Sequence, residues 1–319
     1  MGQHLIVSMS NDRASLTRSA AFASIAMALF LGALKGWAVW QTSSTAMLGS
    51  LADTALDFVA SLATLAGVWI AAQPADNDHR FGHGKAESLA AVFQVILIVL
   101  SASAIAFRAV LRLAQGGETR AAEQGITVSI IAIIATLALV AWQRHVVKRT
   151  GSIAIHTDSV HYQSDLFLNM AVIAALVLDQ YMGMAMADPL FGLAISAWLL
   201  WNAWSASTEA IDNLMDREWP EDRRQAFVER AAGHPELAKM HDLRTRTSGA
   251  QDFAQFHVNL PAEMTVEQAH DIIERVEHDL LSAFPNTEIL IHIDPDGHVD
   301  EPNNQLVEQD EFKRLKEDK

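Results

Sequence analysis

The sequence predicts a polytopic α-helical membrane protein with six transmembrane helices and a C-terminal α+β domain. Half of the 319 residues are hydrophobic and only 19% are charged. Several stretches lack charge over roughly 20 residues, the length that crosses the hydrocarbon core of a bilayer. Residues 215–319 carry 12 Lys and Arg against 24 Asp and Glu, whereas residues 1–214 carry 11 and 14. A nearly neutral, apolar part is therefore joined to an acidic, water-soluble part.

The uncharged stretches locate the six helices. The plainest are 89–107, 125–143 and 189–208. The stretch 166–178 is short, and becomes long enough only if its helix begins near Ala154 and takes His161 and Asp165 into the bilayer. We expect helices near 17–39, 45–72, 86–113, 123–146, 154–180 and 187–211. The polar N-terminus without a small-residue cleavage site does not indicate a cleaved signal peptide.

The distribution of basic residues predicts the orientation, because Lys and Arg accumulate in cytoplasmic loops. One side of the membrane holds Arg13, Arg18, Arg80, Lys85, Arg144, Lys148 and Arg149. On the other side, the loops 41–46 and 180–187 carry no basic residue, and the remaining loop has Arg120 with Arg112 nearby. Both termini are therefore expected in the cytoplasm, in a multi-pass membrane protein.

The C-terminal part has the pattern of a small α+β domain. Residues 221–232 read as an amphipathic helix, 242–248 and 253–260 as a hairpin of two strands, 265–284 as a helix capped by Thr265, and 288–293 as a third strand. The polar end of the chain predicts a disordered, acidic tail. The predicted organisation is a cytoplasmic segment at 1–16, the membrane domain at 17–214, the soluble domain at 215–299 and the tail at 300–319.

Composition excludes some functions. The chain has no Cys, which excludes a disulfide scaffold and leaves His, Asp and Glu to hold any metal. No basic face is present, so nucleic acid is not expected as a partner.

Ionisable residues within the predicted helices are the main functional signal, because charges in a bilayer are costly and mark ion or proton pathways. The second helix carries Asp53 and Asp57 and the fifth carries His161 and Asp165, each pair four residues apart and so on one helix face. Together they offer a complete tetrahedral shell for Zn²⁺ or a similar dication, with no open position for an activated water. Alternatively, the two Asp residues cap or pair with Lys35, and His161 only hydrogen-bonds a neighbouring helix.

Two further clusters lie outside the membrane helices. In the loop 73–85, Asp76, His79 and His83 are close in sequence, and Asp78 is an equally available carboxylate. In the soluble domain, strand pairing can bring together His241, His257, His292 and Asp294, with His270 able to add a bridging ligand. Weak or absent metal binding, with solvated or scattered histidines, is the alternative in both cases.

Five segments resemble the cation diffusion facilitator family, especially its bacterial zinc and iron efflux members: SLADTALDF, FGHGKAESLAA, HYQSDLFLN, HDLRTRTSGA and LIHIDP. They run in order between residues 21 and 295. The resemblance implies a homodimer of six-helix subunits with metallochaperone-like cytoplasmic domains, which exchanges a divalent metal cation for protons across the lipid bilayer.

The resemblance also assigns roles to residues. It implies a transport site at Asp53, Asp57, His161 and Asp165, a loop site at Asp76, His79 and His83, and a dimetal site at His241, His257, His292 and Asp294 with His270 bridging. Family members read Asp-Asp-Asn-His where this chain reads Asp76-Asn77-Asp78-His79, which leaves Asp76 and Asp78 open as the loop carboxylate. Lys85 and Asp216 match a charge interlock at the dimer interface.

The expected function is efflux of Zn²⁺, with Fe²⁺, Cd²⁺ and Co²⁺ as further candidates, by proton antiport and alternating access. Zn²⁺ would also be a structural or regulatory ion of the soluble domain, and no organic cofactor is expected. The chain is not expected to be an enzyme. The alternatives are a metal-gated channel or sensor, and a membrane metallohydrolase, which would need an open coordination position and a general base.

Overall fold

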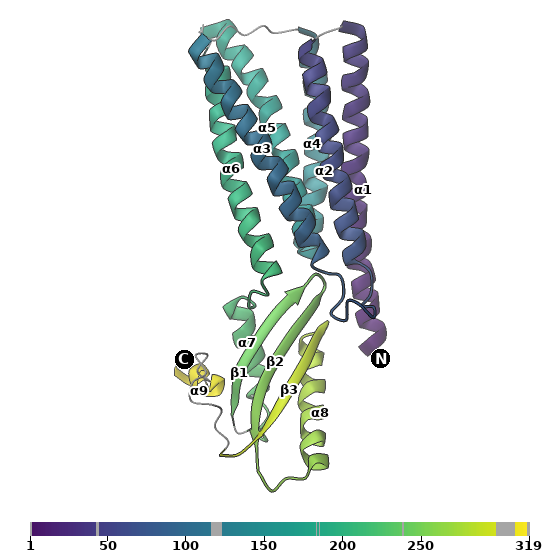
Figure 1. The fold of residues 1–319 in the computed structure, drawn as a ribbon, viewed down its shortest axis with the longest axis vertical. Coiled ribbons are helices and arrows are strands. Elements are labelled where there is room, and N and C mark those ends of the chain that lie inside the picture. Colours follow the sequence, from purple (N-terminus) through teal and green to yellow (C-terminus); the bar gives the residue numbers. More distant parts are fainter. Residues whose placement is uncertain are drawn as a thin grey trace. The chain divides into compact units, whose positions relative to one another are not determined.

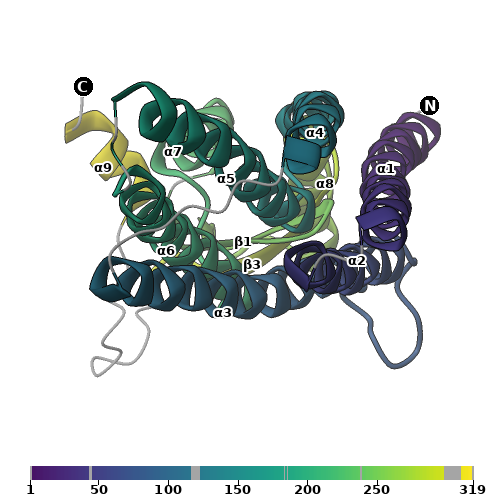
Figure 2. The ribbon, with the colours of Figure 1, turned by 90° about the horizontal axis from the view of Figure 1, so that it is seen from above.

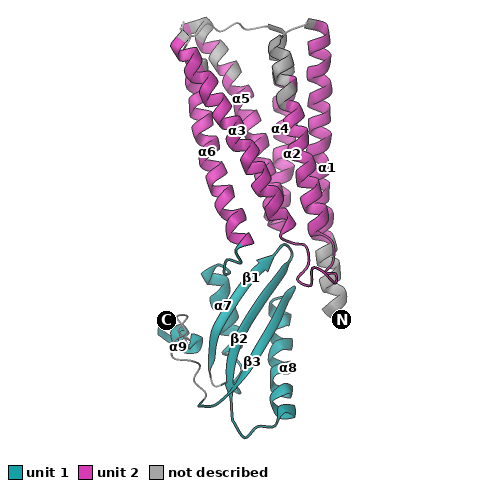
Figure 3. Ribbon diagram, in the orientation of Figure 1, with its two compact units in different colours: residues 1–10, 215–319 teal, residues 11–214 magenta. Residues whose placement is uncertain are grey.

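The computed structural model describes residues 2–42, 45–115, 123–182, 184, 186–237, 239–297 and 310–317. The chain divides into two compact units, one of residues 11–214 and the other of residues 1–10 and 215–319 (Figure 3). The first is helical, and the second holds the sheet.

In the described residues, six long helices make up the first unit, with only Gly2–Ser10 of α1 assigned to the other, and they confirm the prediction from the uncharged stretches (Figures 1 and 2). They are α1 (Gly2–Thr42), α2 (Thr45–Ala71), α3 (Ala86–Gln115), α4 (Glu123–Thr150), α5 (Ile153–Met182) and α6 (Ala187–Leu214). The first begins at Gly2 rather than near residue 17. No Pro or Gly stands between Gln3 and Leu31, so nothing in that sequence breaks the helix.

The helices pack closely, and their large apolar side chains face outward. A Cβ atom added at Gly67 of α2 would lie 2.5 Å from the Cβ of Ala90, so glycine allows α2 and α3 to approach. Trp40, Phe107 and Trp201 are 79%, 65% and 75% exposed, as expected of side chains that face lipid.

Within the part of the chain that the structure describes, four helices contain a span that is long and apolar enough to cross a membrane: Asp12–Gln41, Thr54–Ala71, Ala86–Ala114 and Ile130–Thr150. The helices α5 and α6 are of similar length but fall outside this group. Asp158 and Asp165 of α5 are costly in a bilayer unless a bundle buries them.

The second unit is the predicted α+β domain, with α7 (Glu221–Ala231), β1 (Met240–Ser248), β2 (Gln251–Leu260), α8 (Val266–Ala283) and β3 (Thr287–Pro295). The central strand β2 pairs antiparallel with β1 and parallel with β3. The two helices pack against the sheet around Phe227, Phe256 and Leu280, which are at most 1% exposed (Figure 1). The predicted cap of the second helix is present, since Thr265 and Gln268 form a capping box.

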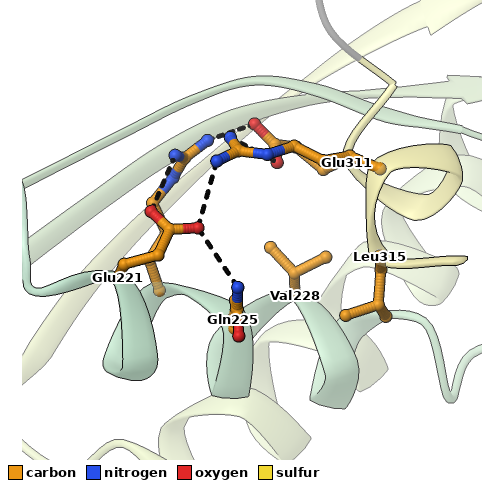
Figure 4. Close-up of a pocket in the computed structure, with 7 residues that line it drawn as sticks. Glu221, Gln225, Val228, Glu311 and Leu315 are labelled. Carbon is orange, nitrogen blue, oxygen red and sulfur yellow. Dashed lines mark hydrogen bonds and ion pairs between the residues drawn. The ribbon is translucent and has the colours of Figure 1, made fainter. Parts of the chain in front are cut away.

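One part of the tail corrects the expectation that 300–319 is disordered. Residues Glu311–Glu317 form a short helix, α9, whose Phe312 and Leu315 pack against the core of the soluble domain. Glu311 is buried and forms an ion pair with Arg224 of α7, and Arg314 bonds Glu221 at 3.1 Å (Figure 4). Two apolar residues three apart give this polar segment one face that can dock.

Candidate metal centres

The membrane unit brings three of the four predicted transport-site residues together. Ligand atoms of Asp57, His161 and Asp165 all lie within 4.8 Å of one another. The Nε2 atom of His161 lies 2.9 Å from Oδ1 of Asp57, which joins α5 to α2. The side chain of Asp53, the fourth predicted residue, lies outside the described residues. The contact between His161 and Asp57 shows that the two helix faces meet as the spacing predicts.

Burial distinguishes this cluster from a solvated group of acids. His161 is 7% exposed and Asp57 is 9% exposed. Lys35, the alternative partner of the Asp residues, donates to Thr54 Oγ1 at 2.7 Å. One imidazole and two carboxylates, drawn from two helices into a buried position, form a donor set suited to Zn²⁺ and similar dications.

The sequence analysis missed a second polar group in the same bundle. Asp158 of α5 is fully buried and accepts hydrogen bonds from Ser24 and Gln143, at 2.5 and 2.7 Å. A signal was available, because Asp158 stands three residues before His161 and so one turn away on nearly the same face.

The loop between α2 and α3 gathers Asp76, His79 and His83, whose ligand atoms lie within 4.8 Å of one another. Asp76 lies 3.4 Å from Nδ1 of His79 and 3.3 Å from Nε2 of His83. The backbone N–H of His79 donates to Asp76 at 2.7 Å and lowers the pKa of this carboxyl below its usual range. The geometry therefore favours Asp76 over Asp78, whose backbone N–H also donates to Asp76.

The sheet of the soluble domain brings together His241, His257 and Asp294, again within 4.8 Å. Strand register explains this, since His257 of β2 is paired with His241 of β1 on one side and with His292 of β3 on the other. Asp294 is 5% exposed, and its Oδ2 lies 2.9 Å from Nδ1 of His257 and 3.5 Å from Nε2 of His241.

His292 lies at the open side of this cluster. Its Nε2 is 3.4 Å from Oδ1 of Asp294, its ring is 4.5 Å from that of His257, and its side chain is 62% exposed. All four predicted residues therefore meet at one end of the sheet. A break in the β1–β2 register follows His241, next to Asp242, which has a φ of 49°.

Two predictions concern a dimer and are not tested by a single chain. His270 belongs to a separate, exposed group with Asp271 and Glu274, and does not join His241, His257 and Asp294. Lys85 donates to the carbonyl of Leu214 at 3.0 Å, and Asp216 lies 3.4 Å from Arg246. The bridging role of His270 and the interlock of Lys85 with Asp216 both concern a dimer, so they stay predictions.

Comparison with known proteins adds family relationships to this geometry. Residues 21–215 match the model of the cation efflux transmembrane domain, and residues 219–296 match that of the cation efflux protein cytoplasmic domain. The cation-efflux pump FieF of Cronobacter sakazakii is 42% identical over 287 residues, which cover 90% of this chain and 95% of that protein. FieF of Pectobacterium carotovorum is 41% identical over 297 residues, covering 93% and 98%.

Among solved structures, the zinc form of CzrB is 33% identical, with a TM-score of 0.24, and covers 27% of this chain and 99% of that one. A nickel form of the MamM C-terminal domain is 27% identical, with a TM-score of 0.23. This match covers 24% of this chain and 98% of the MamM chain. The matches to the two family models, at residues 21–215 and 219–296, account for nearly all of the chain outside its two ends. The two FieF proteins match over almost their whole length. The chain therefore belongs to the cation efflux family, also called the cation diffusion facilitator family.

Proposed function

We propose that this protein exports divalent metal cations across the bacterial inner membrane in exchange for protons. The observation that carries the proposal is the buried contact of His161 with Asp57, beside Asp165, inside a bundle of membrane helices. Membership of the family and 42% identity to a cation-efflux pump support it. Zn²⁺ is the first candidate substrate, and Fe²⁺, Cd²⁺ and Co²⁺ are others.

The ligand set accounts for the choice of metal. One imidazole among carboxylates suits a borderline dication, whereas a shell made only of oxygen atoms would suit Mn²⁺ or Mg²⁺ better. With Asp53 as the fourth ligand, the tetrahedral shell is closed, and no open position is left for a water to be activated. We therefore propose binding and release of the ion rather than hydrolysis.

The same ligands couple metal to protons. Zn²⁺ binds the neutral imidazole of His161 and the ionised carboxylates of Asp57 and Asp165, so metal binding displaces protons and protonation displaces metal. A proton gradient directed into the cell then favours loading of metal on one side and its release on the other. Alternating exposure of the site needs only rearrangement of helices around a fixed ligand set.

The soluble domain has a separate role in this proposal. His241, His257, His292 and Asp294 would bind Zn²⁺ at the end of the sheet, and Asp76, His79 and His83 would bind it in the loop. We propose that the protein is a homodimer with both termini in the cytoplasm, in which His270 bridges the soluble metal site and Lys85 pairs with Asp216. The match to a family of cytoplasmic domains supports metal binding by this part of the chain.

Transport in proteoliposomes tests the function. Purified protein should take up Zn²⁺ faster when a pH gradient is imposed in the exchanging direction, and a panel of Zn²⁺, Cd²⁺, Fe²⁺, Co²⁺ and Mn²⁺ should rank the substrates. Zn²⁺ flux that is independent of the pH gradient would favour a metal-gated channel. Hydrolytic activity without flux would favour a metallohydrolase, and either result would overturn antiport.

A further inference from the structure

Five polar side chains meet inside the membrane unit, one from each of the helices α1 to α5. They form what we call the Asp158 cluster: Ser24, Thr64, Gln94, Gln143 and Asp158. Each is at most 1% exposed. The cluster is thus as deeply buried as the apolar core around it, and an ionisable residue at such a position in a membrane bundle is a candidate for function.

Both oxygens of the carboxylate are hydrogen-bonded by neutral donors. Oδ2 accepts from Ser24 and Gln143, and Oδ1 accepts from Gln94 at 2.9 Å and from Thr64 at 3.5 Å. The donors are linked in turn, since Gln143 donates to Ser24 at 3.0 Å and Gln94 to Thr64 at 2.5 Å. All four donors to the carboxylate are neutral, so hydrogen bonds rather than a cation hold it in the bundle.

The two glutamines leave an acceptor unused on each side of the carboxylate. Oε1 of Gln94 and Oε1 of Gln143 are buried and have no hydrogen-bond partner in the described part of the chain. A primary amide offers either its NH₂ group or its carbonyl oxygen to a neighbour by turning about its last bond. The glutamines can therefore donate to an ionised Asp158, or accept the hydrogen of a protonated one.

The cluster lies next to the candidate transport site. Asp158 precedes His161 by three residues on α5, and Thr64 follows Asp57 by seven residues, or two turns, on α2. Between them, Tyr162 lies 3.0 Å from Ser61 and donates to the carbonyl of Ser24 at 2.9 Å.

The titratable groups close enough to interact in this region are His161, Tyr162 and Asp165 of α5 and Asp57 of α2. The side chains that α1, α3 and α4 contribute to the cluster are neutral. The nearest source of variable charge is therefore the transport site itself, whose occupancy by a dication changes the local charge.

We propose that Asp158 is a proton-binding residue of the transport cycle, separate from the metal ligands, whose two glutamine partners turn to serve its ionised and its protonated forms. The inference rests on the proposed antiport. In the step itself, a hydronium ion gives a proton to a carboxylate oxygen of Asp158, which forms an O–H bond and leaves water, and the reverse step returns the proton to water. A dication at Asp57, His161 and Asp165 favours the ionised form, and its departure leaves like charges that favour protonation.

The Asp158→Asn variant of the full-length protein tests this, because asparagine keeps the shape and polarity of the side chain but cannot titrate. The number of protons released per protomer when Zn²⁺ saturates the protein is measured by calorimetry in buffers of different ionisation enthalpy. We expect about one proton fewer than in the wild type, and weaker acceleration of Zn²⁺ flux by a pH gradient. Because asparagine stands in for the neutral carboxyl group, the variant should bind zinc as the wild type does at acidic pH, where Asp158 is protonated, and more weakly at alkaline pH. Glu209→Gln, which removes another carboxylate of the bundle, 3.2 Å from His156, is the matched control and should keep the proton count.

A purely structural role makes different predictions. It predicts lower zinc affinity in Asp158→Asn with an unchanged proton count, and that result would overturn the inference. If this variant does not fold, Gln143→Leu decides, because loss of a donor to the anion should move proton release to higher pH without changing its number. An unchanged pH profile in Gln143→Leu would overturn the inference. Wild-type protein that releases no protons on binding Zn²⁺ would instead refute the proposed antiport itself.

Discussion

The metal cluster in the membrane unit and the one in the soluble domain use the same types of side chain, His and Asp, but are built in different ways. Asp57, His161 and Asp165 come from two helices of a bundle that faces lipid, where Asp57 and His161 are buried and Asp165 is half-buried. His241, His257 and Asp294 come from three strands, and His292 leaves one side of that cluster open, since it is 62% exposed. A closed site in a bilayer suits an ion that is carried, and an open site on a sheet suits an ion that is collected, sensed or shared.

The two sites should also respond differently to the loss of a ligand. A buried carboxylate in the bundle lacks water as a substitute ligand, whereas an exposed histidine can be replaced by water. Loss of a membrane ligand should therefore stop transport outright. Loss of a soluble ligand should weaken metal binding and stability while transport continues.

The largest expected effect is that of Asp57→Ala or Asp165→Ala. Either change leaves too few ligands to hold the ion, so Zn²⁺ uptake by proteoliposomes should fall by at least about 100-fold. The protein should still insert and dimerise, and zinc binding by its soluble domain should be unchanged, because neither residue belongs to an apolar core. Glu209→Gln serves as the control for loss of a carboxylate. Uptake at the wild-type rate in both variants would show that these residues are not the transport site.

The next effect is a change of selectivity. His161→Asp replaces a borderline nitrogen ligand by a hard oxygen, so transport should shift from Zn²⁺ and Cd²⁺ towards Mn²⁺. The dependence of transport on pH near neutrality should also change, because the imidazole is removed. Uptake of each metal at several pH values measures both. The same metal ranking and the same pH profile as the wild type would mean that His161 does not bind the ion.

The two clusters also differ in how much the sequence could predict. The membrane pairs follow from helical periodicity alone, since residues four apart share a face and charges in an apolar helix are conspicuous. The soluble cluster follows less directly, since its grouping depends on strand order and register; strand pairing suggested it, and the resemblance to a family supported it. The Asp158 cluster was missed because four of its five members are neutral side chains on different helices, whose meeting depends on packing that no local pattern records.

The helix α9 was missed for a related reason. Its seven residues are mostly charged, so composition favoured disorder. The packing of Phe312 and Leu315 against the core of the soluble domain depends on tertiary structure and cannot be predicted from this segment alone. Local propensity is a weak guide for a segment this short, because tertiary contacts decide its structure.

A third prediction concerns the soluble domain alone. Residues 215–319 have their own core, so they should fold without the membrane part, bind more than one Zn²⁺ and dimerise more tightly with metal. Bound dications offset the repulsion between two acidic domains. They also stabilise the folded state by about 2.7 kcal/mol at a free zinc concentration 100 times Kd. Calorimetry and analytical ultracentrifugation measure these effects.

In the same domain, His257→Ala combined with Asp294→Ala should remove most of the rise in melting temperature with zinc. The control is His278→Ala, which removes an exposed histidine of α8. Transport by the full-length double variant should persist. A domain that stays monomeric and binds no zinc would contradict the soluble site and leave the membrane site untouched.

The smallest effect tests whether α9 belongs to the soluble domain. Leu315 is partly buried against its core, so Leu315→Ala should lower the free energy of unfolding by about 1 kcal/mol. For a domain of this size, that corresponds to a fall in melting temperature of roughly 4–8 °C. Lys316→Ala changes an exposed residue of the same helix and should have almost no effect, which separates lost packing from a general weakening of α9. Equal melting temperatures for the two variants would show that α9 does not dock in solution. Zinc transport should be the same in both, because the membrane cluster lies in the other unit of the chain.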